Sequence, residues 1–295
     1  MSSNSLSLRC VPVPPFQPRC RNPAPRRFAR CKAADFASGS LETSLDKLVE
    51  VDSQYHGKIR VFQNQDVRVL TTASQDCEGM HSVTFGEQVA SDGLWGAMSI
   101  LPALVPDGPI GLFGLGSGSI AHCIRCFYPN RDMVGWEIDP QMVEIGRQWM
   151  DLGDVEKNGN LVINVGDCFS GDAQVPGGFA GIIVNVYTQN CLNSELTQVE
   201  TMIDLKNRLA RGGRILVNLA GDEETMEEAR DALMEAFEGE VMFKYATAGN
   251  LIALTGLIPS EKSWQKLPDA LTENSENWFG GACEGSGEFD EEEEL

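Results

Sequence analysis

Long apolar runs are missing from this 295-residue chain, since no window holds 18 consecutive apolar residues, although 42% of its residues are hydrophobic. A helix that crosses a membrane needs a run of about that length, so the sequence offers no such span. The apolar fraction is ordinary for a globular protein. The length therefore allows one large α/β domain with an appendage, or two small domains.

Closely spaced cysteines are also scarce. Six of the nine cysteines lie beyond residue 34 and are scattered, which excludes a disulfide framework. The one close pair, Cys123 and Cys126, would lie one turn apart on a helix. A zinc site would need a second pair at suitable spacing, and the sequence has none, so we expect core cysteines and no metal.

Acidic residues are absent from the first 34 positions, which carry seven Lys or Arg among many Ser and Pro. This composition, without the continuous apolar core of a secretory signal, is typical of an organelle transit peptide. Ser and Pro ahead of a late Arg cluster favour the chloroplast over the mitochondrion. We therefore predict that residues 1–34 are a chloroplast transit peptide; a disordered basic tail is the alternative.

Positive charge is scarce in the remainder. The formal net charge is −20 for the whole chain, and residues 35–295 hold 16 basic against 43 acidic residues. A surface this acidic repels nucleic acid and anionic lipid, so we expect neither nucleic acid nor a membrane as a partner. The last residues, "GEFDEEEEL", are expected to be a solvated, disordered tail.

Hydrophobic periodicity divides the rest of the chain. The pattern of residues 41–50 predicts a short amphipathic helix, and the alternation in "GKIRVFQ" and "DVRVLTT" predicts strands of a small β-hairpin region. Residues 86–105 are expected to be mostly helical. We divide the chain into a transit peptide (1–34), an N-terminal helix and β-hairpin region (35–108), a main domain (109–258) and a C-terminal segment with the acidic tail (259–295).

Strands and helices alternate through the main domain. Its continuously apolar strands predict a doubly wound, Rossmann-like, mostly parallel α/β sheet with helices on both faces. Two last strands predict a closing antiparallel hairpin, which ordinary dinucleotide-binding sheets do not have. The expected strands are 109–115, 132–138, 161–165, 180–186, 214–219, 240–247 and 250–257, and the expected helices are 118–128, 140–151, 194–210 and 222–237.

Glycines cluster where the first of these strands ends. In "GLFGLGSGS", Gly114, Gly116 and Gly118 permit a sharp turn and the close approach of a ligand, and the next helix would aim its first amides at that ligand. Glu137 ends the second strand, 21 residues after Gly116. A carboxylate there can accept hydrogen bonds from both hydroxyls of a ribose. Loop and carboxylate together predict a nucleoside ligand; a tight turn without a ligand is the alternative.

Two features bear on which nucleoside binds. The pattern Gly116-x-Gly118-x-x-Ala121 also fits a dinucleotide, so the loop alone leaves NAD open. The closing hairpin favours a different ligand, as does Asp167 after the third strand, where it would hydrogen-bond an adenine amino group. This arrangement resembles the class I S-adenosylmethionine-dependent transferases.

A closer resemblance covers about residues 50–257. Five stretches are similar, in order and spacing, to those of the spermidine synthases, or polyamine aminopropyltransferases: "SQYHGKI" (53–59), "GLGSGS" (114–119), Glu137-Ile138-Asp139, Asp167-Cys168 and "FAGIIVNVY" (179–187). The resemblance implies S-adenosylmethionine or decarboxylated S-adenosylmethionine as cofactor, and a homodimer through the N-terminal strands. The cofactor-binding residues it implies are Gly114, Gly116, Ser117, Gly118, Glu137, Ile138, Asp167 and Cys168.

The departures from that family fall on its chemistry. The loop Asp that helps hold the primary amine of the decarboxylated cofactor is replaced by Ser117. A Tyr-His-Glu stretch that shapes the polyamine site corresponds to Trp95-Gly96-Ala97. The Asp that deprotonates the attacking amine is replaced by Asn185, whose amide cannot take a proton at neutral pH. These losses argue against spermidine synthesis by the family mechanism.

Asn185 and Tyr187 are the candidates for the catalytic positions. Tyr187 would orient a substrate or act as a weak base, or would cap the strand and pack its ring. Asn190 is expected to edge the same pocket, and His56, at a family Gln position near the ribose, is the alternative base. Leu112 stands where methyltransferases often carry an acid for the methionine amine, so the adenosine half of the ligand is better supported.

Three functions fit these observations. The first is methyl transfer from S-adenosylmethionine to an unidentified small molecule in the plastid, because methyl transfer to an acceptor that is already nucleophilic needs mainly positioning. The second is a divergent aminopropyltransferase with another base. The third is a binding protein that keeps the nucleoside site without turnover.

Overall fold

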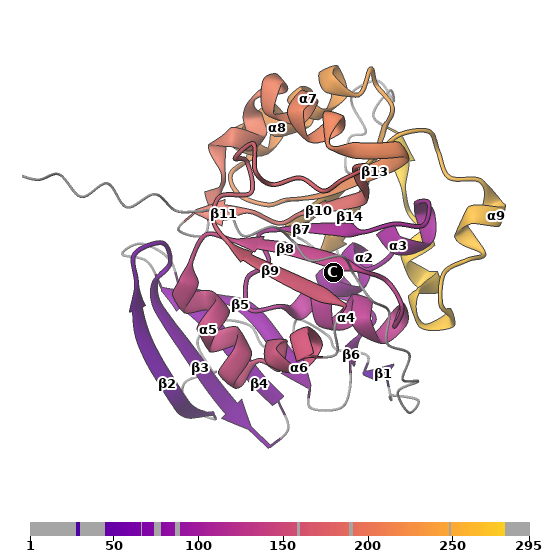
Figure 1. The fold of residues 1–295 in the computed structure, drawn as a ribbon. Helices are drawn as coiled ribbons and strands as arrows, with labels where there is room; N and C mark the ends of the chain where they lie inside the picture. The colour runs from indigo at the N-terminus through magenta and orange to yellow at the C-terminus, as the bar shows by residue number, and fades with distance from the viewer. Residues whose placement is uncertain are drawn as a thin grey trace, which may run out of the picture.

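The computed structural model describes residues 28–29, 45–65, 67–73, 78–85, 89–157, 160–188, 191–247 and 249–280. These residues form a large mixed sheet with helices on both faces, and a separate four-stranded antiparallel sheet beside it (Figure 1). The fold class predicted from the sequence is therefore confirmed.

The large sheet has eight strands in the order β16-β14-β15-β13-β10-β7-β8-β9. Five neighbouring strands are parallel, from β13 to β9. The hairpin of β14 and β15 then closes the sheet antiparallel to β13, as the sequence predicts. The bounds are β7 Ile110–Phe113, β8 Met133–Glu137, β9 Leu161–Val165, β10 Phe179–Val184, β13 Leu209–Leu219, β14 Val241–Thr247 and β15 Asn250–Thr255.

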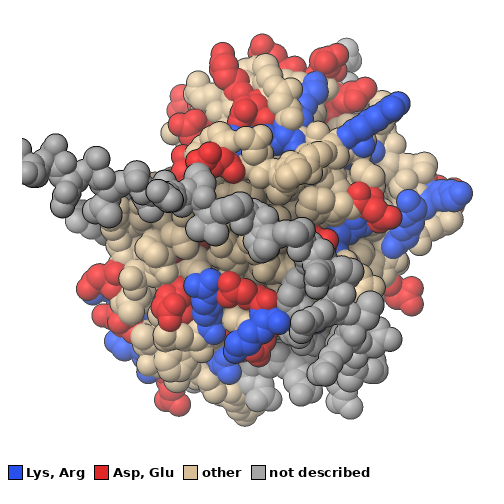
Figure 2. All heavy atoms as spheres, viewed as in Figure 1, with Lys and Arg blue, Asp and Glu red and all other residues tan. Residues whose placement is uncertain are grey.

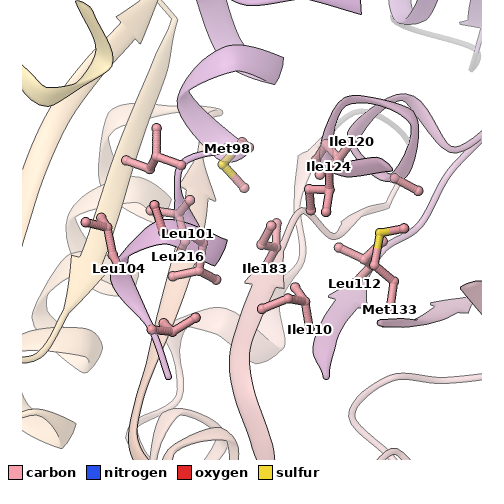
Figure 3. Close-up of a cluster of buried hydrophobic side chains, with 14 of the residues drawn as sticks. Met98, Leu101, Leu104, Ile110, Leu112, Ile120, Ile124, Met133, Ile183 and Leu216 are labelled. Carbon is pink, nitrogen blue, oxygen red and sulfur yellow. The ribbon is translucent and has the colours of Figure 1, made fainter. Parts of the chain in front are cut away.

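One face of the sheet is covered by three helices that precede or follow β7. They are α2 (Gly93–Met98), α3 (Leu101–Leu104) and α4 (Ser119–Phe127). Figure 3 shows Met98 and Leu101 facing Ile183 and Leu216, while Ile120 and Ile124 face Leu112. Both α2 and α3 lie within residues 86–105, which were expected to be mostly helical. Gly96 and Ala97 of α2 are buried in this core.

The opposite face is covered by α7 (Val199–Asn207) and α8 (Glu223–Ala236), which lie together above the sheet in Figure 1. A short 3-10 turn, η2 (Ser194–Thr197), leads into α7, so the single helix expected over 194–210 is broken in two. Two further helices, α5 (Pro140–Trp149) and α6 (Leu152–Lys157), lie between β8 and β9 in the chain. On the face of the sheet that α7 covers, three aromatic rings pack edge to face, with ring centroids no more than 5.8 Å apart. They belong to Phe113, Trp136 and Phe179.

The N-terminal sheet packs on α5. Its strands are β2 (Asp46–Ser53), β3 (Gly57–Asn64), β4 (Val67–Ala73) and β5 (Glu78–Phe85), all antiparallel. Ile59, Val61 and Leu70 meet Met142 and Ile145 of α5 in a small core of their own. The sheet is therefore held against the helix that follows β8.

The helix predicted over residues 41–50 is wrong for the described part of that stretch. Residues 46–50 begin β2, which pairs with β3 along its whole length. Leu41, Leu45 and Leu48 have helical spacing, but Val49 and Val51 alternate with charged residues and pack against the small core that the N-terminal sheet forms with α5. Tertiary pairing has overridden a weak local helical pattern.

The last described residues return to the sheet. After α9 (Glu261–Trp264) and a 3-10 segment, η3 (Asp269–Ser275), the two-residue strand β16 (Phe279–Gly280) pairs with β14. Buried Lys244 of β14 donates hydrogen bonds to the backbone oxygens of Glu273 and Glu276. At the other end of the chain, β1 (Phe28–Ala29) pairs with β6 (Val89–Ala90).

Acidic side chains are spread over the face of the molecule seen in Figure 2, with Lys and Arg set between them. Several of these charges are paired, such as Arg147 with Glu156 at 2.8 Å. Among the described helices, none has both the length and the apolar character needed to cross a membrane.

The turn after β7 depends on a glycine. Gly114 has φ +78°, and a β-carbon there would lie 2.2 Å from the backbone oxygen of Asn185, which follows the neighbouring β10. The two strand ends touch at a point where no side chain fits. The sharp turn and the β7–β10 contact thus require the same residue.

We expect Gly114→Ala to lower the free energy of unfolding by more than about 3 kcal/mol, because it adds both backbone strain and a clash with backbone. Urea denaturation measures this. Gly171→Ala is the matched control, since Gly171 has open space around its α-carbon, and it should change stability by less than about 0.5 kcal/mol. Equal effects of the two substitutions would contradict this account of the turn.

Candidate functional site

A pocket lies beyond the carboxyl ends of β7, β8, β9 and β10, lined also by residues of the N-terminal sheet. The chain leaves β7 for β8 on one side and later places β10 on the other, so this is the point where the strand order reverses, the usual binding crevice of such sheets. The pocket holds about 650 Å³ of empty space, counting its open mouth.

Glu137, the last residue of β8, is the central group of the pocket. Its side chain is 5% exposed. Oε2 accepts a hydrogen bond of 2.7 Å from the backbone amide of Gly116, and Oε1 accepts one of 3.1 Å from the amide of Asp139. The carboxylate thus joins the glycine loop to the turn after β8.

The ionisation of Glu137 is set by opposing effects. Burial alone would raise the pKa of its carboxyl, but the His56 imidazole and the amides of Asp139 and Gly116 offset burial and bring the pKa below its ordinary value. The group is therefore a carboxylate at neutral pH. Each oxygen keeps a second lone pair, which can accept a hydroxyl of a ligand.

The glycine loop is divided between the pocket and the core. Gly114 and Gly116 line the pocket. Ser117 and Gly118 lie outside the pocket lining, although the resemblance implied that they bind the cofactor. Ser117 is fully buried against Gly146 of α5, and its Oγ has no hydrogen-bond partner among the described residues. Gly118, with φ +97°, is the residue at which α4 begins.

The N-terminal sheet reaches the pocket through the turn after β2. Ser53 Oγ donates a hydrogen bond of 2.5 Å to Asp139, and the amides of Tyr55 and His56 donate to the same Ser53 oxygen. Asp139 also caps α5 by accepting from the amide of Gln141. Tyr55 and His56 are held at the pocket wall in this way.

Two histidines stand over Glu137. The rings of His56 and His81 meet edge to face with centroids 5.7 Å apart, and His56 Nε2 lies 3.9 Å from Glu137 Oε1. His81 comes from β5, and its ring lies so close to Gly116 that a β-carbon there would be 2.7 Å from Cε1. Burial, then the charge of His56, lowers the pKa of His81 to about 4, against the opposite pull of Glu137 and Asp139. His81 is therefore neutral at pH 7.

The loop after β9 carries Asp167 and Cys168 into the pocket. Asp167 is exposed, and Oδ1 accepts from the amide of Phe169. Cys168 is buried, and burial raises the pKa of its thiol to about 12, so it is no nucleophile at neutral pH. Ile138 and Phe169 lie beside them in the pocket wall.

Arg208, at the end of α7, holds this loop from below. The buried guanidinium donates hydrogen bonds to the backbone oxygens of Cys168, Phe169 and Ala173, at 2.7, 2.9 and 3.1 Å, and pairs with Asp204. It therefore satisfies three carbonyls at once and fixes where Asp167 points. Nothing in the local sequence of Arg208 signals this role.

Asn185 and Tyr187, which follow β10, both line the pocket. Asn185 Oδ1 accepts a hydrogen bond of 2.9 Å from Asn218 of β13. The Tyr187 hydroxyl donates to the backbone oxygen of Asn218, and burial raises the pKa of Tyr187. A protonated phenol engaged with backbone anchors the strand end and is a poor base. Asn190 lies outside the described residues.

The structure thus brings together most of the residues singled out in the sequence. Gly114, Gly116, Glu137, Ile138, Asp167, Cys168, Asn185 and Tyr187 line one pocket. Trp95-Gly96-Ala97, the counterpart of the polyamine-site stretch, belongs to α2 and its core. Across the described ranges, no three His, Cys, Asp or Glu side chains are grouped so as to hold a metal ion.

Comparison with known proteins places the fold. No protein-family model matches the chain. No curated protein matches it in sequence. Solved structures do match, and they show that the chain has a spermidine synthase-like fold of the class I S-adenosylmethionine-dependent methyltransferase type.

Three of these structures show the extent of the likeness. A probable spermidine synthase from Corynebacterium glutamicum is 18% identical, with a TM-score of 0.59 over 77% of this chain and 86% of that one. A spermidine synthase in complex with the transition-state analogue AdoDATO is 12% identical, with a TM-score of 0.59 over 76% and 77%. Human methyltransferase-like protein 13 in complex with SAH is 17% identical, with a TM-score of 0.51 over 62% and 92%.

His81 should make stability depend on pH. Its pKa is about 4 in the folded protein against 6.5 ordinarily, so between these values the unfolded chain binds a proton that the folded protein does not. Stability should therefore rise with pH across this window, with up to about 1.4 kcal/mol per pH unit from this residue. We expect His81→Gln to flatten the curve measured by urea denaturation from pH 4 to 7. An unchanged slope would contradict the lowered pKa.

Arg208→Lys should weaken the loop after β9. Lysine cannot reach three carbonyls in the planar arrangement of a guanidinium, so buried oxygens lose their donors, and we expect a loss of about 2–4 kcal/mol. Hydrogen exchange should rise in residues 167–173 in particular. Arg211→Lys, the same change at an exposed site, is the control and should alter neither quantity. Equal behaviour of the two variants would refute the role of Arg208.

Proposed function

We propose that this protein binds S-adenosylmethionine at the carboxyl ends of β7–β10 and transfers its methyl group to a small-molecule acceptor. The observation that carries the proposal is Glu137, a buried, ionised carboxylate at the end of β8, bonded to the amide of Gly116. A carboxylate at this place in a doubly wound sheet is suited to the two hydroxyls of a ribose.

The strand order gives the ligand a direction. Asp167 follows the edge strand β9, Glu137 ends β8, and Asn185 follows β10 on the far side of β7. With the ribose at Glu137, the adenine would lie towards Asp167 and Phe169, where its amino group meets a carboxylate and its ring meets an aromatic side chain. The sulfur and its substituents would then lie towards Asn185.

The far side of the pocket favours methyl transfer over aminopropyl transfer. None of the side chains that line this side is ionised at neutral pH. They are those of Asn185, Val186, Tyr187, Thr188 and Asn193. Among the described residues that line this side, none offers a carboxylate that would bind a cationic polyamine or take a proton from an ammonium. The fold likeness to spermidine synthases keeps the aminopropyl reaction as the second candidate.

Methyl transfer requires neither a base nor a carboxylate on this side of the pocket when the acceptor is already nucleophilic. The acceptor's lone pair forms a bond to the methyl carbon while the carbon–sulfur bond breaks. The electron pair of the broken bond stays on sulfur, which neutralises the sulfonium and gives S-adenosylhomocysteine. A nucleophile that is already unprotonated needs alignment and exclusion of water. Asn185 and Thr188 can supply alignment, and His56, His81 and Tyr55 close the site from the N-terminal sheet.

The cellular setting and assembly belong to the same proposal. The basic, Ser- and Pro-rich composition of residues 1–34 supports import into the chloroplast, with a small-molecule acceptor there. A homodimer through the N-terminal four-stranded sheet stays a prediction. Its outer strand, β2, is largely exposed along its length, including Leu48.

Calorimetric titration of residues 35–295 with S-adenosylmethionine, decarboxylated S-adenosylmethionine and 5′-methylthioadenosine tests the proposal. We expect S-adenosylmethionine to bind more tightly than the decarboxylated form, and bound cofactor to be consumed in plastid extract. Tighter binding of the decarboxylated form would favour aminopropyl transfer. Binding without turnover would favour a non-catalytic protein, and no binding of any of the three would refute the nucleoside site.

Glu137→Gln should weaken all three ligands alike, because each contains the ribose. We expect a loss of about 1.5–3 kcal/mol of binding free energy, the range for a hydrogen bond to a charged group. Glu144→Gln, which changes an exposed carboxylate on α5, is the control and should leave affinity as it is. If Glu137→Gln binds as the unaltered protein does, the ribose assignment is wrong.

A further inference from the structure

A row of side-chain hydrogen bonds runs across the sheet behind the pocket. The Thr247 hydroxyl of β14 donates to Asn250 Oδ1 at 2.7 Å, and Asn250 Nδ2 donates to Asn218 Oδ1 at 3.1 Å. Asn218 Nδ2 then donates to Asn185 Oδ1 at 2.9 Å. Four residues from four strands or strand ends, β14, β15, β13 and β10, are thereby joined.

Every bond in this row points the same way. An amide oxygen only accepts and an amide nitrogen only donates, so the orientation of each Asn fixes that of the next. Thr247 starts the row with its hydroxyl proton. At the other end, Asn185 Nδ2 donates to none of the described residues, and Asn185 is one of the residues that line the pocket. The wall therefore presents N–H donors at this place.

Burial makes the direction hard to reverse. Asn218 is 1% exposed, so its amide has no water to exchange partners with. Turning Asn218 alone would set nitrogen against nitrogen at Asn250 and oxygen against oxygen at Asn185. All three amides would have to turn together, and the Thr247 hydroxyl, which already accepts from the amide of Gly249, would have to become the acceptor of Asn250 as well.

The position of Asn185 in the sheet indicates which part of a bound cofactor would lie next to it. Neighbouring strands lie about 4.8 Å apart, so the end of β10 is about 10 Å from the end of β8 where Glu137 lies. A ligand with its ribose at Glu137 extends its sulfur substituents over this distance. The amino-acid end of the cofactor therefore reaches the Asn185 side of the pocket, where it offers either a carboxylate or, once decarboxylated, an ammonium alone.

We propose that Asn185 selects the carboxylated cofactor: its Nδ2 group donates a hydrogen bond to the α-carboxylate, and Thr247, Asn250 and Asn218 are positioning residues that keep this donor facing the ligand. The inference rests on the proposed binding of S-adenosylmethionine. It assigns the choice between the two cofactor forms to a neutral amide held in one orientation.

The first test compares Asn185→Asp with the unaltered protein for the same three ligands. Aspartate can still accept from Asn218, but it sets a carboxylate towards the ligand. We expect affinity for S-adenosylmethionine to fall by about tenfold or more through like-charge repulsion, and affinity for the decarboxylated form to rise. Affinity for 5′-methylthioadenosine, which has neither group, should change by less than about twofold. An unchanged ratio of the first two affinities would overturn the proposal.

The second test uses Thr247→Val, which adds no charge and lies away from the ligand. Without the threonine hydroxyl, Asn250 loses its partner in either direction, so nothing at this end favours the original direction, and the reversed row, which turns Asn185 Oδ1 to the pocket, becomes populated. The preference for S-adenosylmethionine over the decarboxylated form should fall by about threefold or more, with affinity for 5′-methylthioadenosine kept. A purely structural role of the row would lower all three affinities together and refute the proposal.

Asn193→Asp is the matched charge control. Asn193 lines the same pocket, and its Oδ1 accepts from the amide of Glu195, as an aspartate would. It should shift the preference less than Asn185→Asp does; an equal shift would reduce the effect to net charge and refute the selection by Asn185. If the unaltered protein binds none of the three ligands, the proposed function fails. If it binds them and Asn185→Asp leaves their ratio intact, the function stands and the inference fails.

Discussion

The buried carboxylate of Glu137 is the contact on which the site depends. Its two oxygens hold the glycine loop through Gly116 and the start of α5 through Asp139. Asp139 in turn receives Ser53 from the N-terminal sheet, which brings His56 within 3.9 Å of the same carboxylate. One ionised group thus holds the glycine loop, the start of α5 and the turn after β2 around a single cavity. A ligand that binds this carboxylate meets a preformed frame.

The two halves of the cavity differ in electrostatic character. The half formed by β8 and β9 carries the charges of Glu137 and Asp167, and the half at β10 carries amides and hydroxyls. Ser117, the loop residue that replaces an acid of the similar family, is buried away from the cavity, which deepens the contrast. An adenosine ligand would therefore meet charged groups at one half and neutral hydrogen-bonding groups at the other.

Local patterns predicted the parallel sheet well, because its strands are continuous apolar runs bounded by polar residues and glycine; β9 has the bounds expected for it. Glu137 followed from its spacing to the loop. Arg208 and Asn218 could not be predicted, since each acts on a segment more than 30 residues away. His81 lies in an alternating stretch that a strand assignment could have revealed. The spacing of Leu41, Leu45 and Leu48 imitated a helix, which the pairing of β2 with β3 overrode.

The short strand β16 has a consequence beyond completing the sheet. Its two residues pair with Met242 and Phe243, and Phe279 stacks on Tyr245 at 6.1 Å, which covers part of the outer backbone of β14. Unpaired strand edges are templates for joining another chain. β16 therefore protects this edge against edge-to-edge self-association, and a chain cut before Phe279 would carry an open, partly aromatic edge that favours aggregation.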